Sequence, residues 1–175
     1  MRHDRESARH IVKQSMYSIR INVAEQKLYL LDEQGKVSVE YAVSTSRHGI
    51  GNENGSEKTP LGLHRIKQKI GGSMPINMVF VGREPMGTLQ DCIEQGTELP
   101  QDVITSRIMW LEGMEPGRNQ GGYVDSYNRY IYIHGTSEEG QIGRPASIGC
   151  IRMRNQDVID LYRRVDIGTE VLIEA

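Results

Sequence analysis

Cys150 and His134 are the two residues whose types and surroundings best suit covalent catalysis. Cys150 lies in the segment Ser-Ile-Gly-Cys-Ile-Arg-Met at residues 147–153. A glycine directly before a cysteine allows a tight turn that exposes the sulfur, and neighbouring backbone N–H groups can then converge to stabilise an oxyanion. A free thiol has a pKa of about 8.5, so an imidazole must accept its proton or pair with the thiolate. His134, on the preceding predicted strand, is the candidate base.

Arg152 places a fixed positive charge two residues after the candidate nucleophile. In an extended backbone, residues 150 and 152 project to the same side, so the guanidinium is expected beside the thiolate and beside any carboxylate of a substrate. The structural alternative is an ion pair with an acidic residue near the start of the following helix, such as Asp157 or Asp160.

Each of these residue types also has an ordinary structural role. Free cysteines are among the most buried residues, and Cys92, with no glycine turn and no obvious basic neighbour, is interpreted as structural. The Gly149 turn could be a simple bend, and Tyr130 and Tyr132 could either pack across strands or line a site. The remaining histidines show no metal-ligand spacing and are interpreted as surface or capping residues: His3, His10, His48 and His64.

One strand and one helix must position the candidate site. In the strand at residues 130–134, Tyr130, Tyr132 and His134 share one face, while the isoleucines at 131 and 133 share the other and would be buried. Asn155 is a favourable helix cap, and apolar residues at 158, 161, 162 and 165 predict a short amphipathic helix that Gly168 ends. Residues 171–173 predict a closing strand.

The rest of the chain is predicted to be strands joined by loops. Residues 1–16 form a polar arm, and period-two alternation predicts a meander of strands at 17–23, 26–31 and 37–43. A loop at 44–58 leads through a turn at 59–62 into a strand ending near residue 66. Breaker-rich residues 70–104 predict a folded-over insertion with one short strand at 78–81, followed by a strand at 107–111. Residues 112–128 predict a long surface loop, a type of segment that often serves as a lid.

Bulk composition excludes several classes of protein. The chain has 175 residues, a length typical of one domain, and a formal net charge of −2, which offers no overall field for nucleic acid. No apolar run approaches the roughly 20 residues of a membrane-spanning helix, so no membrane anchor is expected. Six of the first thirteen residues are basic or histidine, and no apolar core of a signal peptide follows. We therefore expect a missing leader, another export route or a cytoplasmic location.

Taken together, three motifs resemble the catalytic domain of the L,D-transpeptidases, the YkuD-like family. They are Tyr-Ile-Tyr-Ile-His-Gly-Thr at residues 130–136, Ile-Gly-x-Pro at 142–145 and Ser-x-Gly-Cys-x-Arg at 147–152. Upstream, Gln-Lys-Leu-Tyr-Leu at 26–30, Val-Ser-Thr at 43–45 and Thr-Pro-Leu-Gly at 59–62 are similar to that family's first strands. The resemblance runs from about residue 17 to 173. It implies a mainly β, sandwich-like catalytic domain at 17–175, with short helices and a long loop or lid insertion.

The resemblance also implies a reaction. The family's nucleophile corresponds to Cys150 and its base to His134, with the Gly135 carbonyl orienting the imidazole and the N–H groups of Gly149 and Cys150 holding the oxyanion. Cys150 would attack the bond between a diamino acid and D-alanine in a peptidoglycan stem and pass the acyl group to an acceptor amine. No metal or organic cofactor is required, and the expected location is the periplasm or cell envelope. Four motif residues are expected to contact substrate: Tyr132, Thr136, Ser147 and Arg152.

One departure and two alternative functions bear on this reading. The family usually carries a second histidine directly before the Gly-Cys pair, where this chain has Ile148, which can neither donate a hydrogen bond nor transfer a proton. An L,D-carboxypeptidase or amidase would share every step up to the thioester and then use water. A non-catalytic wall-binding module would keep the fold alone, but the presence of both Cys150 and His134 argues against it. The sequence leaves the oligomeric state open.

Overall fold

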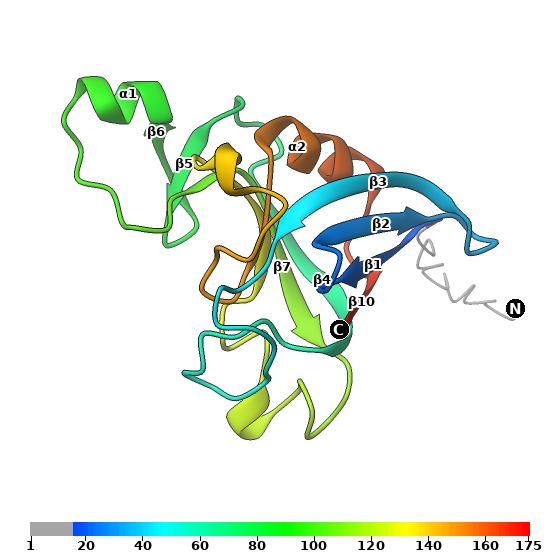
Figure 1. Cartoon of the computed structure of the whole chain (residues 1–175). Coiled ribbons are helices and arrows are strands. Elements are labelled where there is room, and N and C mark those ends of the chain that lie inside the picture. Colours follow the sequence, from blue (N-terminus) through cyan, green and yellow to red (C-terminus); the bar gives the residue numbers. More distant parts are fainter. Residues whose placement is uncertain (1–15) are drawn as a thin grey trace, which may run out of the picture.

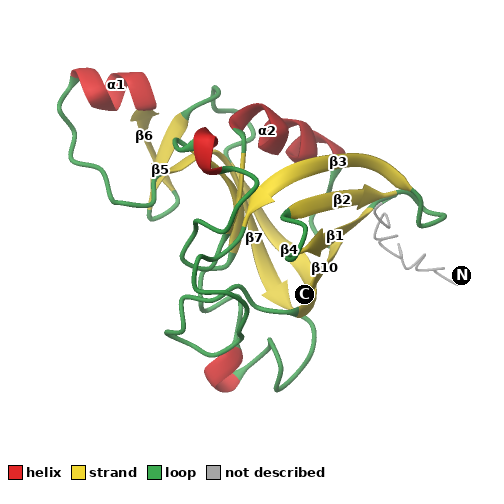
Figure 2. Ribbon diagram, viewed as in Figure 1, coloured by secondary structure: helices red, strands yellow, loops and turns green. Residues whose placement is uncertain are grey.

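The computed structural model describes residues 16–175, so most of the predicted N-terminal arm lies outside the described residues. The strands and helices follow one another along the chain as shown in Figures 1 and 2. The strands are β1 Ser18–Asn22, β2 Lys27–Leu31, β3 Val37–Ser44, β4 Gly62–Ile70, β5 Met78–Val81, β6 Glu84–Thr88, β7 Ile104–Gly113, β8 Tyr132–Thr136, β9 Ile151–Met153 and β10 Glu170–Glu174. The helices are α1 Leu89–Glu94 and α2 Asn155–Arg164, with single 3-10 turns η1 Gly122–Val124 and η2 Glu139–Gln141.

The ten strands of the described part form one sheet in the order β4-β10-β1-β2-β3-β9-β8-β7-β5-β6. An additional pairing joins β4 to β7, so the sheet closes on itself and the β5–β6 hairpin extends from β7. Strand β8 pairs with β9 in parallel, whereas its pairing with β7 is antiparallel. The mainly β class is thus confirmed, and the opposing layers of the expected sandwich belong to one continuous sheet.

The main core fills the interior of this closed sheet. Alternate residues of the strands point inward, as the period-two patterns of β1 and β2 predict, and bury Ile19 and Ile21 of β1 and Leu28 and Leu30 of β2. Helix α2 packs its apolar stripe, including Val158 and Leu161, against the same core (Figure 1). Burial of this single continuous core is what holds β8 and β9 side by side.

Two details of helix α2 differ from the sequence expectation. Asn155 is its first helical residue, and the residue before it, Arg154, occupies the cap position without a side-chain cap bond. The Asn155 side chain is instead buried, where its Oδ1 accepts hydrogen bonds from the hydroxyls of Thr105 (2.5 Å) and Ser106 (2.6 Å). The helix ends at Arg164, so Gly168 forms the turn into β10 rather than the helix end.

The 70–104 insertion is more ordered than its many glycines and prolines indicate. Strand β5 pairs with β6, which the sequence did not predict, and Thr88 caps α1 through a reciprocal capping box with Asp91. Figure 1 shows this hairpin and helix projecting from the body of the molecule. A small satellite core of Val79, Cys92 and Val103 holds them together, which confirms the structural role of Cys92, a free thiol.

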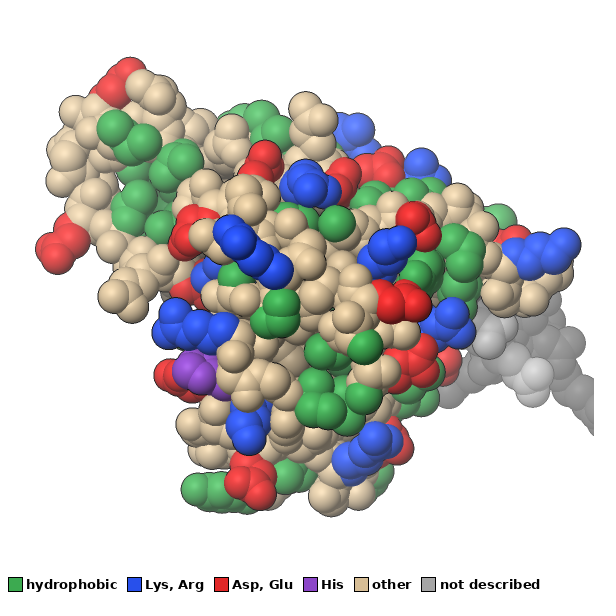
Figure 3. All heavy atoms as spheres, viewed as in Figure 1, with side chains coloured by type: hydrophobic (Ala, Val, Ile, Leu, Met, Phe, Trp, Pro, Cys, Tyr) green, Lys and Arg blue, Asp and Glu red, His purple; other side chains and the backbone are tan. Residues whose placement is uncertain are grey.

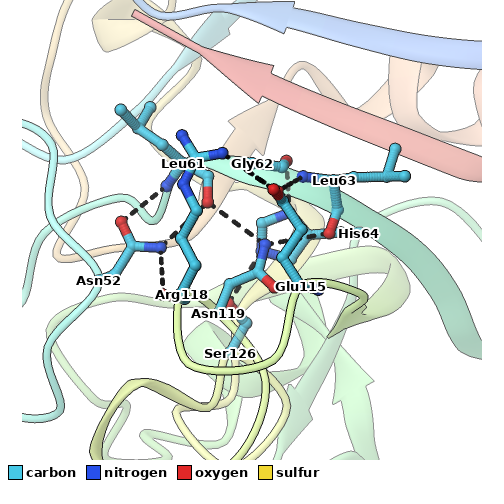
Figure 4. A network of polar contacts seen from close by, with 9 residues as sticks. All are labelled: Asn52, Leu61, Gly62, Leu63, His64, Glu115, Arg118, Asn119 and Ser126. Carbon is cyan, nitrogen blue, oxygen red and sulfur yellow. Dashed lines mark hydrogen bonds and ion pairs between the residues drawn. The ribbon is translucent and has the colours of Figure 1, made fainter.

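The long 112–128 loop is bonded to β4 and is not a free lid. Figure 4 shows Glu115 accepting the N–H of Leu63 (2.7 Å) and Asn119 donating to the Leu63 carbonyl (3.0 Å). His64, which we expected at the surface, is buried, with Nδ1 3.0 Å from the Gly62 carbonyl and Nε2 2.8 Å from Ser126 Oγ. Burial lowers the pKa of His64 to about 4. The loop is therefore a fixed wall that leads directly into residues 127–130.

The outer surface carries charge of both signs. On the face drawn in Figure 3, acidic and basic side chains alternate with apolar ones, in keeping with the net charge of −2. Within residues 16–175, no helix has the length and apolarity needed to cross a membrane. In the same range, no three His, Cys, Asp or Glu side chains are grouped so that they could hold a metal ion.

Candidate active site

Cys150 ends a tight turn that leads directly into β9. Gly149 has φ 134°, a backbone conformation that residues with a side chain rarely adopt, and this allows the sharp bend before the cysteine. The Ser147 hydroxyl donates to the Cys150 carbonyl (2.6 Å) and accepts the Gly149 N–H (3.2 Å), while Thr59 Oγ1 donates to the Gly149 carbonyl (3.0 Å). These bonds fix the turn from both sides and hold the thiol in one place.

His134 lies on the neighbouring strand β8. Ile131 and Ile133 belong to the main core, while the Tyr132 ring packs in a second cluster against which Cys150 also lies. Cys150 leads into β9, and in the parallel pairing of β8 with β9 the backbone of Arg152 lies opposite that of His134. The imidazole Nδ1 lies 2.6 Å from the Gly135 carbonyl, a geometry that places the proton on Nδ1 and the lone pair on Nε2. His134 is therefore preset as a proton acceptor through Nε2.

Gly135 is required at its position because two strands approach closely there. A Cβ at residue 135 would lie 2.5 Å from the Thr105 carbonyl and 2.7 Å from Asn155 Oδ1, distances that real Cβ atoms do not show. Asn155 also donates to the Thr136 carbonyl (2.9 Å). A glycine between His134 and this polar network thus lets the Gly135 carbonyl stay aimed at the imidazole.

Two backbone groups at the start of β8 contact the sulfur, one from Tyr130 just before the strand and one from Tyr132, its first residue. The thiol donates to the Tyr130 carbonyl, 3.3 Å from Sγ, and the Tyr132 N–H lies 3.4 Å from Sγ. Burial raises the pKa of Cys150 to about 12, although the Tyr132 N–H and the cations Arg152 and Arg129 favour the thiolate. Burial also lowers the pKa of His134. The resting pair is a neutral thiol and a neutral imidazole.

Arg152 has a partner that the sequence did not reveal. Its Nη2 lies 2.6 Å from Asp102 Oδ1, and the two side chains are only 5% and 19% exposed. The alternatives that we expected are engaged elsewhere, because Asp157 lies 4.0 Å from Arg154 and Asp160 pairs with Arg164 at 3.1 Å. Arg152 is therefore a buried residue behind the thiol, in an ion pair, and it is not free to bind a carboxylate of a substrate.

The unpartnered polar atoms of the interior gather at this point. Four buried side-chain nitrogen or oxygen atoms make no hydrogen bond among residues 16–175, and three of them are Asp102 Oδ1, His134 Nε2 and Arg152 Nε. Asp102 Oδ1 is held by its ion pair with Arg152 Nη2, which leaves His134 Nε2 and Arg152 Nε without a partner. Buried polar atoms are nearly always bonded, so a cluster of exceptions marks a place where another molecule supplies the partners. This polar cluster lies beside Cys150, the candidate nucleophile.

A pocket of about 460 Å³ opens over the thiol and imidazole. Tyr132 lines it, as expected, whereas Ser147 and Thr136 are buried and bond to the backbone of the neighbouring turns. Ile148, which stands where the resembled family has a histidine, is 43% exposed and lines the pocket as an apolar group. The full lining comprises Asn54, Gly55, Glu57, Asp102, Ile104, Asn128, Arg129, Tyr130, Ile131, Tyr132, His134, Ile148 and Cys150.

Aromatic rings form the floor beneath Tyr130 and Tyr132. Trp110 stacks on Tyr127 with ring centroids 4.2 Å apart and meets the Tyr132 ring edge-on at 5.5 Å. Arg83, from the β5–β6 hairpin, lies 4.8 Å above the Trp110 ring and donates to the Tyr132 hydroxyl (3.2 Å). The projecting hairpin is thereby fastened to the pocket wall.

Sequence reasoning missed Asp102, Arg129 and Arg83 as parts of this region. Asp102 lies in a breaker-rich segment without periodicity, and Arg129 lies at the end of a predicted surface loop. Neither position carries a local signal, because it is chain topology that brings both to Cys150. The adjacency of Arg129 to the Tyr-Ile-Tyr-Ile-His strand was the one available hint.

Comparison with known proteins identifies relatives in both sequence and fold. The family model described as the L,D-transpeptidase catalytic domain, YkuD, matches residues 16–173. The putative L,D-transpeptidase YkuD of Bacillus subtilis is 48% identical over 59 residues, which are 33% of this chain and 36% of that protein. The probable L,D-transpeptidase YcfS of Escherichia coli is 30% identical over 156 residues, 87% of this chain and 42% of that protein. The alignments span less than half of either relative.

Solved structures share the fold at low sequence identity. An L,D-transpeptidase from Mycobacterium smegmatis has a TM-score of 0.54 and 16% identity, covering 92% of this chain and 59% of that chain. The L,D-transpeptidase from Xylanimonas cellulosilytica has a TM-score of 0.55 and 18% identity, covering 93% and 62%. Because the family model matches nearly all of the described residues, and the fold agrees, the chain belongs to the YkuD family of L,D-transpeptidase catalytic domains.

Proposed function

We propose that this chain is a cysteine acyl transferase that acts on peptidoglycan stem peptides through Cys150. The observation that carries the proposal is a single pocket that holds a turn-mounted thiol together with an imidazole whose Nδ1 is fixed and whose Nε2 has no partner. A nucleophile, a base and a third group that orients the base are the three parts of a covalent acyl-transfer site. Family membership supports the stem peptide as substrate.

In the first half-reaction, His134 Nε2 takes the thiol proton as Sγ attacks the carbonyl carbon of the diamino acid in the stem. The carbonyl oxygen becomes an oxyanion. Because the Gly149 N–H is already directed at Ser147 Oγ, we assign the N–H of Cys150 as an oxyanion donor. The C–N bond then breaks, His134 returns its proton to the departing nitrogen, and D-alanine leaves a thioester on Cys150.

In the second half-reaction, an amine from an acceptor stem attacks the thioester carbonyl. His134 Nε2 accepts a proton from the attacking nitrogen, the C–S bond breaks, and the thiolate is protonated again. The Tyr132 N–H, 3.4 Å from Sγ, stabilises the leaving thiolate. The proposed setting is the periplasm or cell envelope, where peptidoglycan is found.

The test is the mass of the intact protein after incubation with a disaccharide-tetrapeptide. We expect an adduct that has lost D-alanine in the wild type and in Cys92→Ala, and none in Cys150→Ala. Adding an acceptor amine should then release a cross-linked or exchanged product. Release of only the shortened stem, with or without the amine, would identify an L,D-carboxypeptidase. Absence of any adduct in the wild type would contradict the proposal.

A further inference from the structure

We propose that Arg129 is the specificity-determining residue of this pocket and binds the terminal carboxylate of the stem peptide, on the D-alanine that leaves. The inference rests on the proposed function and adds the group that would distinguish a free C-terminus from an internal peptide bond. It also replaces Arg152, whose guanidinium is buried against Asp102. Three observations support Arg129: its place beside the nucleophile, its lack of a carboxylate partner, and its unused hydrogen-bond donors.

The backbone of Arg129 is fixed one residue from the sulfur. The carbonyl of the next residue, Tyr130, accepts the thiol of Cys150 at 3.3 Å. Consecutive Cα atoms are about 3.8 Å apart, so the Arg129 side chain originates at the edge of the reacting centre. The fixed 112–128 loop sets this origin, because Ser126 is held by His64 at 2.8 Å.

The guanidinium end is also held near the nucleophile. Nη2 donates to the Lys58 carbonyl (2.7 Å) and to Ser56 Oγ (3.3 Å), and Nη1 donates to the Gly51 carbonyl (3.3 Å). The Lys58 carbonyl lies 3.5 Å from the position that a Cβ of Gly149 would occupy. The charge is thereby placed next to the turn that carries Cys150.

The positive charge of Arg129 has no anionic partner among residues 16–175 within ion-pair distance. The two acidic residues that line the same pocket have other neighbours. Asp102 is in an ion pair with Arg152, and Glu57 lies 3.2 Å from the His48 imidazole, a contact that is an ion pair only when the imidazole is protonated. Partial burial lowers the pKa of Arg129, with Cys150 as the acidic group that acts in the opposite direction. A half-buried cation without a carboxylate is costly unless a ligand supplies one.

Arg129 keeps donors for such a ligand. A guanidinium has five N–H donors, and three are used by the bonds to residues 51, 56 and 58, which leaves Nε–H and one Nη1–H. Each of these hydrogens can donate one charge-assisted bond to a carboxylate oxygen. In a stem that ends in D-alanine, the carboxylate carbon is three bonds from the carbonyl carbon that Cys150 attacks. A cation beside the nucleophile is therefore better placed to bind this carboxylate than the other carboxylates of the stem, which lie farther from the attacked carbon.

The test compares two substrates in three proteins. The substrates are the disaccharide-tetrapeptide and its analogue with a C-terminal carboxamide. The proteins are the wild type, Arg129→Gln and the control Arg154→Gln, which removes a surface arginine outside the pocket lining. The readout is kcat/KM for formation of the Cys150 thioester, followed by intact mass. We expect the wild type to favour the carboxylate substrate by about ten- to hundredfold, as one charge-assisted interaction would give. Arg129→Gln should bring the ratio close to one, whereas Arg154→Gln should preserve it.

The comparison separates recognition from structure, because loosening of the 51–58 loop would slow both substrates alike and leave the ratio intact. That outcome would overturn the inference, as would a wild-type ratio of one or loss of the ratio in Arg154→Gln. If Arg129→Gln fails to fold, Arg129→Lys keeps the charge without the planar fork and should show a reduced ratio; an unchanged ratio in that variant contradicts the inference. Failure of the wild type to react with either substrate would instead overturn the proposed function, and this inference with it.

Discussion

The ion pair between Arg152 and Asp102 predicts that Arg152 stabilises the fold. From the sequence, Arg152 was expected beside the thiolate or a carboxylate of the substrate. Replacing Arg152 with Gln leaves Asp102 without its partner at 2.6 Å. Removing one member of a buried pair costs about 3–5 kcal/mol, and we expect the lower end because Asp102 keeps 19% exposure to solvent. For a domain of this size each kcal/mol lowers Tm by about 2–4 °C, so the expected fall is about 6–12 °C.

A double-mutant cycle measured by thermal unfolding tests this reasoning. Asp102→Asn should cost more than Arg152→Gln, because Arg152, at 5% exposure, would be the unpaired charge. The double variant Asp102→Asn/Arg152→Gln should be more stable than the sum of the single effects indicates. Arg154→Gln is the matched control, since its pair with Asp157 spans 4.0 Å at the surface and should matter by less than about 0.5 kcal/mol. An unchanged Tm for Arg152→Gln, combined with lost turnover, would refute the structural role.

Four further predictions concern the site and its supports. Cys150→Ala should abolish turnover at nearly wild-type Tm, while Cys92→Ala should stay within a few-fold of wild-type activity; loss of the acyl-enzyme in the second variant would identify Cys92 as the nucleophile. Because burial raises the pKa of Cys150 to about 12, labelling by a small neutral electrophile should be slower than for free cysteine at pH 7 and should keep rising through pH 10; a plateau near pH 8.5 would contradict this. Gly135→Ala should lower both Tm and activity, because its Cβ would meet the Thr105 carbonyl at 2.5 Å; wild-type kinetics would show that the carbonyl at 135 does not orient His134. Because the pKa of His64 is lowered to about 4 in the folded chain, His64 takes up a proton first in the unfolded chain as the pH falls. The free energy of unfolding should therefore fall by up to about 1.4 kcal/mol per pH unit between about pH 6.5 and pH 4. In His64→Gln, chemical denaturation should show a weaker dependence of this free energy on pH.

The parts of the fold that the sequence predicted are those with a regular local pattern. Alternation located β1, β2 and β3, and the same period placed Ile131 and Ile133 in the core, opposite to His134. Contacts between distant segments could not be predicted in this way. Asp102 and Arg152 are fifty positions apart, and their ion pair depends on β7, β8 and β9 lying side by side. Asn155 shows a related ambiguity, because the same side chain suits a helix cap and a buried polar network.

The strongest physical constraint on the proposed reaction is that burial acts on the pKa values of Cys150 and His134 in opposite directions. It raises the pKa of the Cys150 thiol and lowers the pKa of His134, so the proton rests on sulfur and the imidazole lone pair stays available. The backbone provides for both states of the sulfur, since the Tyr130 carbonyl accepts from the thiol and the Tyr132 N–H donates to the thiolate. The two groups belong to the peptide bonds on either side of Ile131, so both can face one atom although Tyr130 lies in a turn with φ 57°. The same fixed backbone therefore holds the sulfur both as a thiol and as a thiolate.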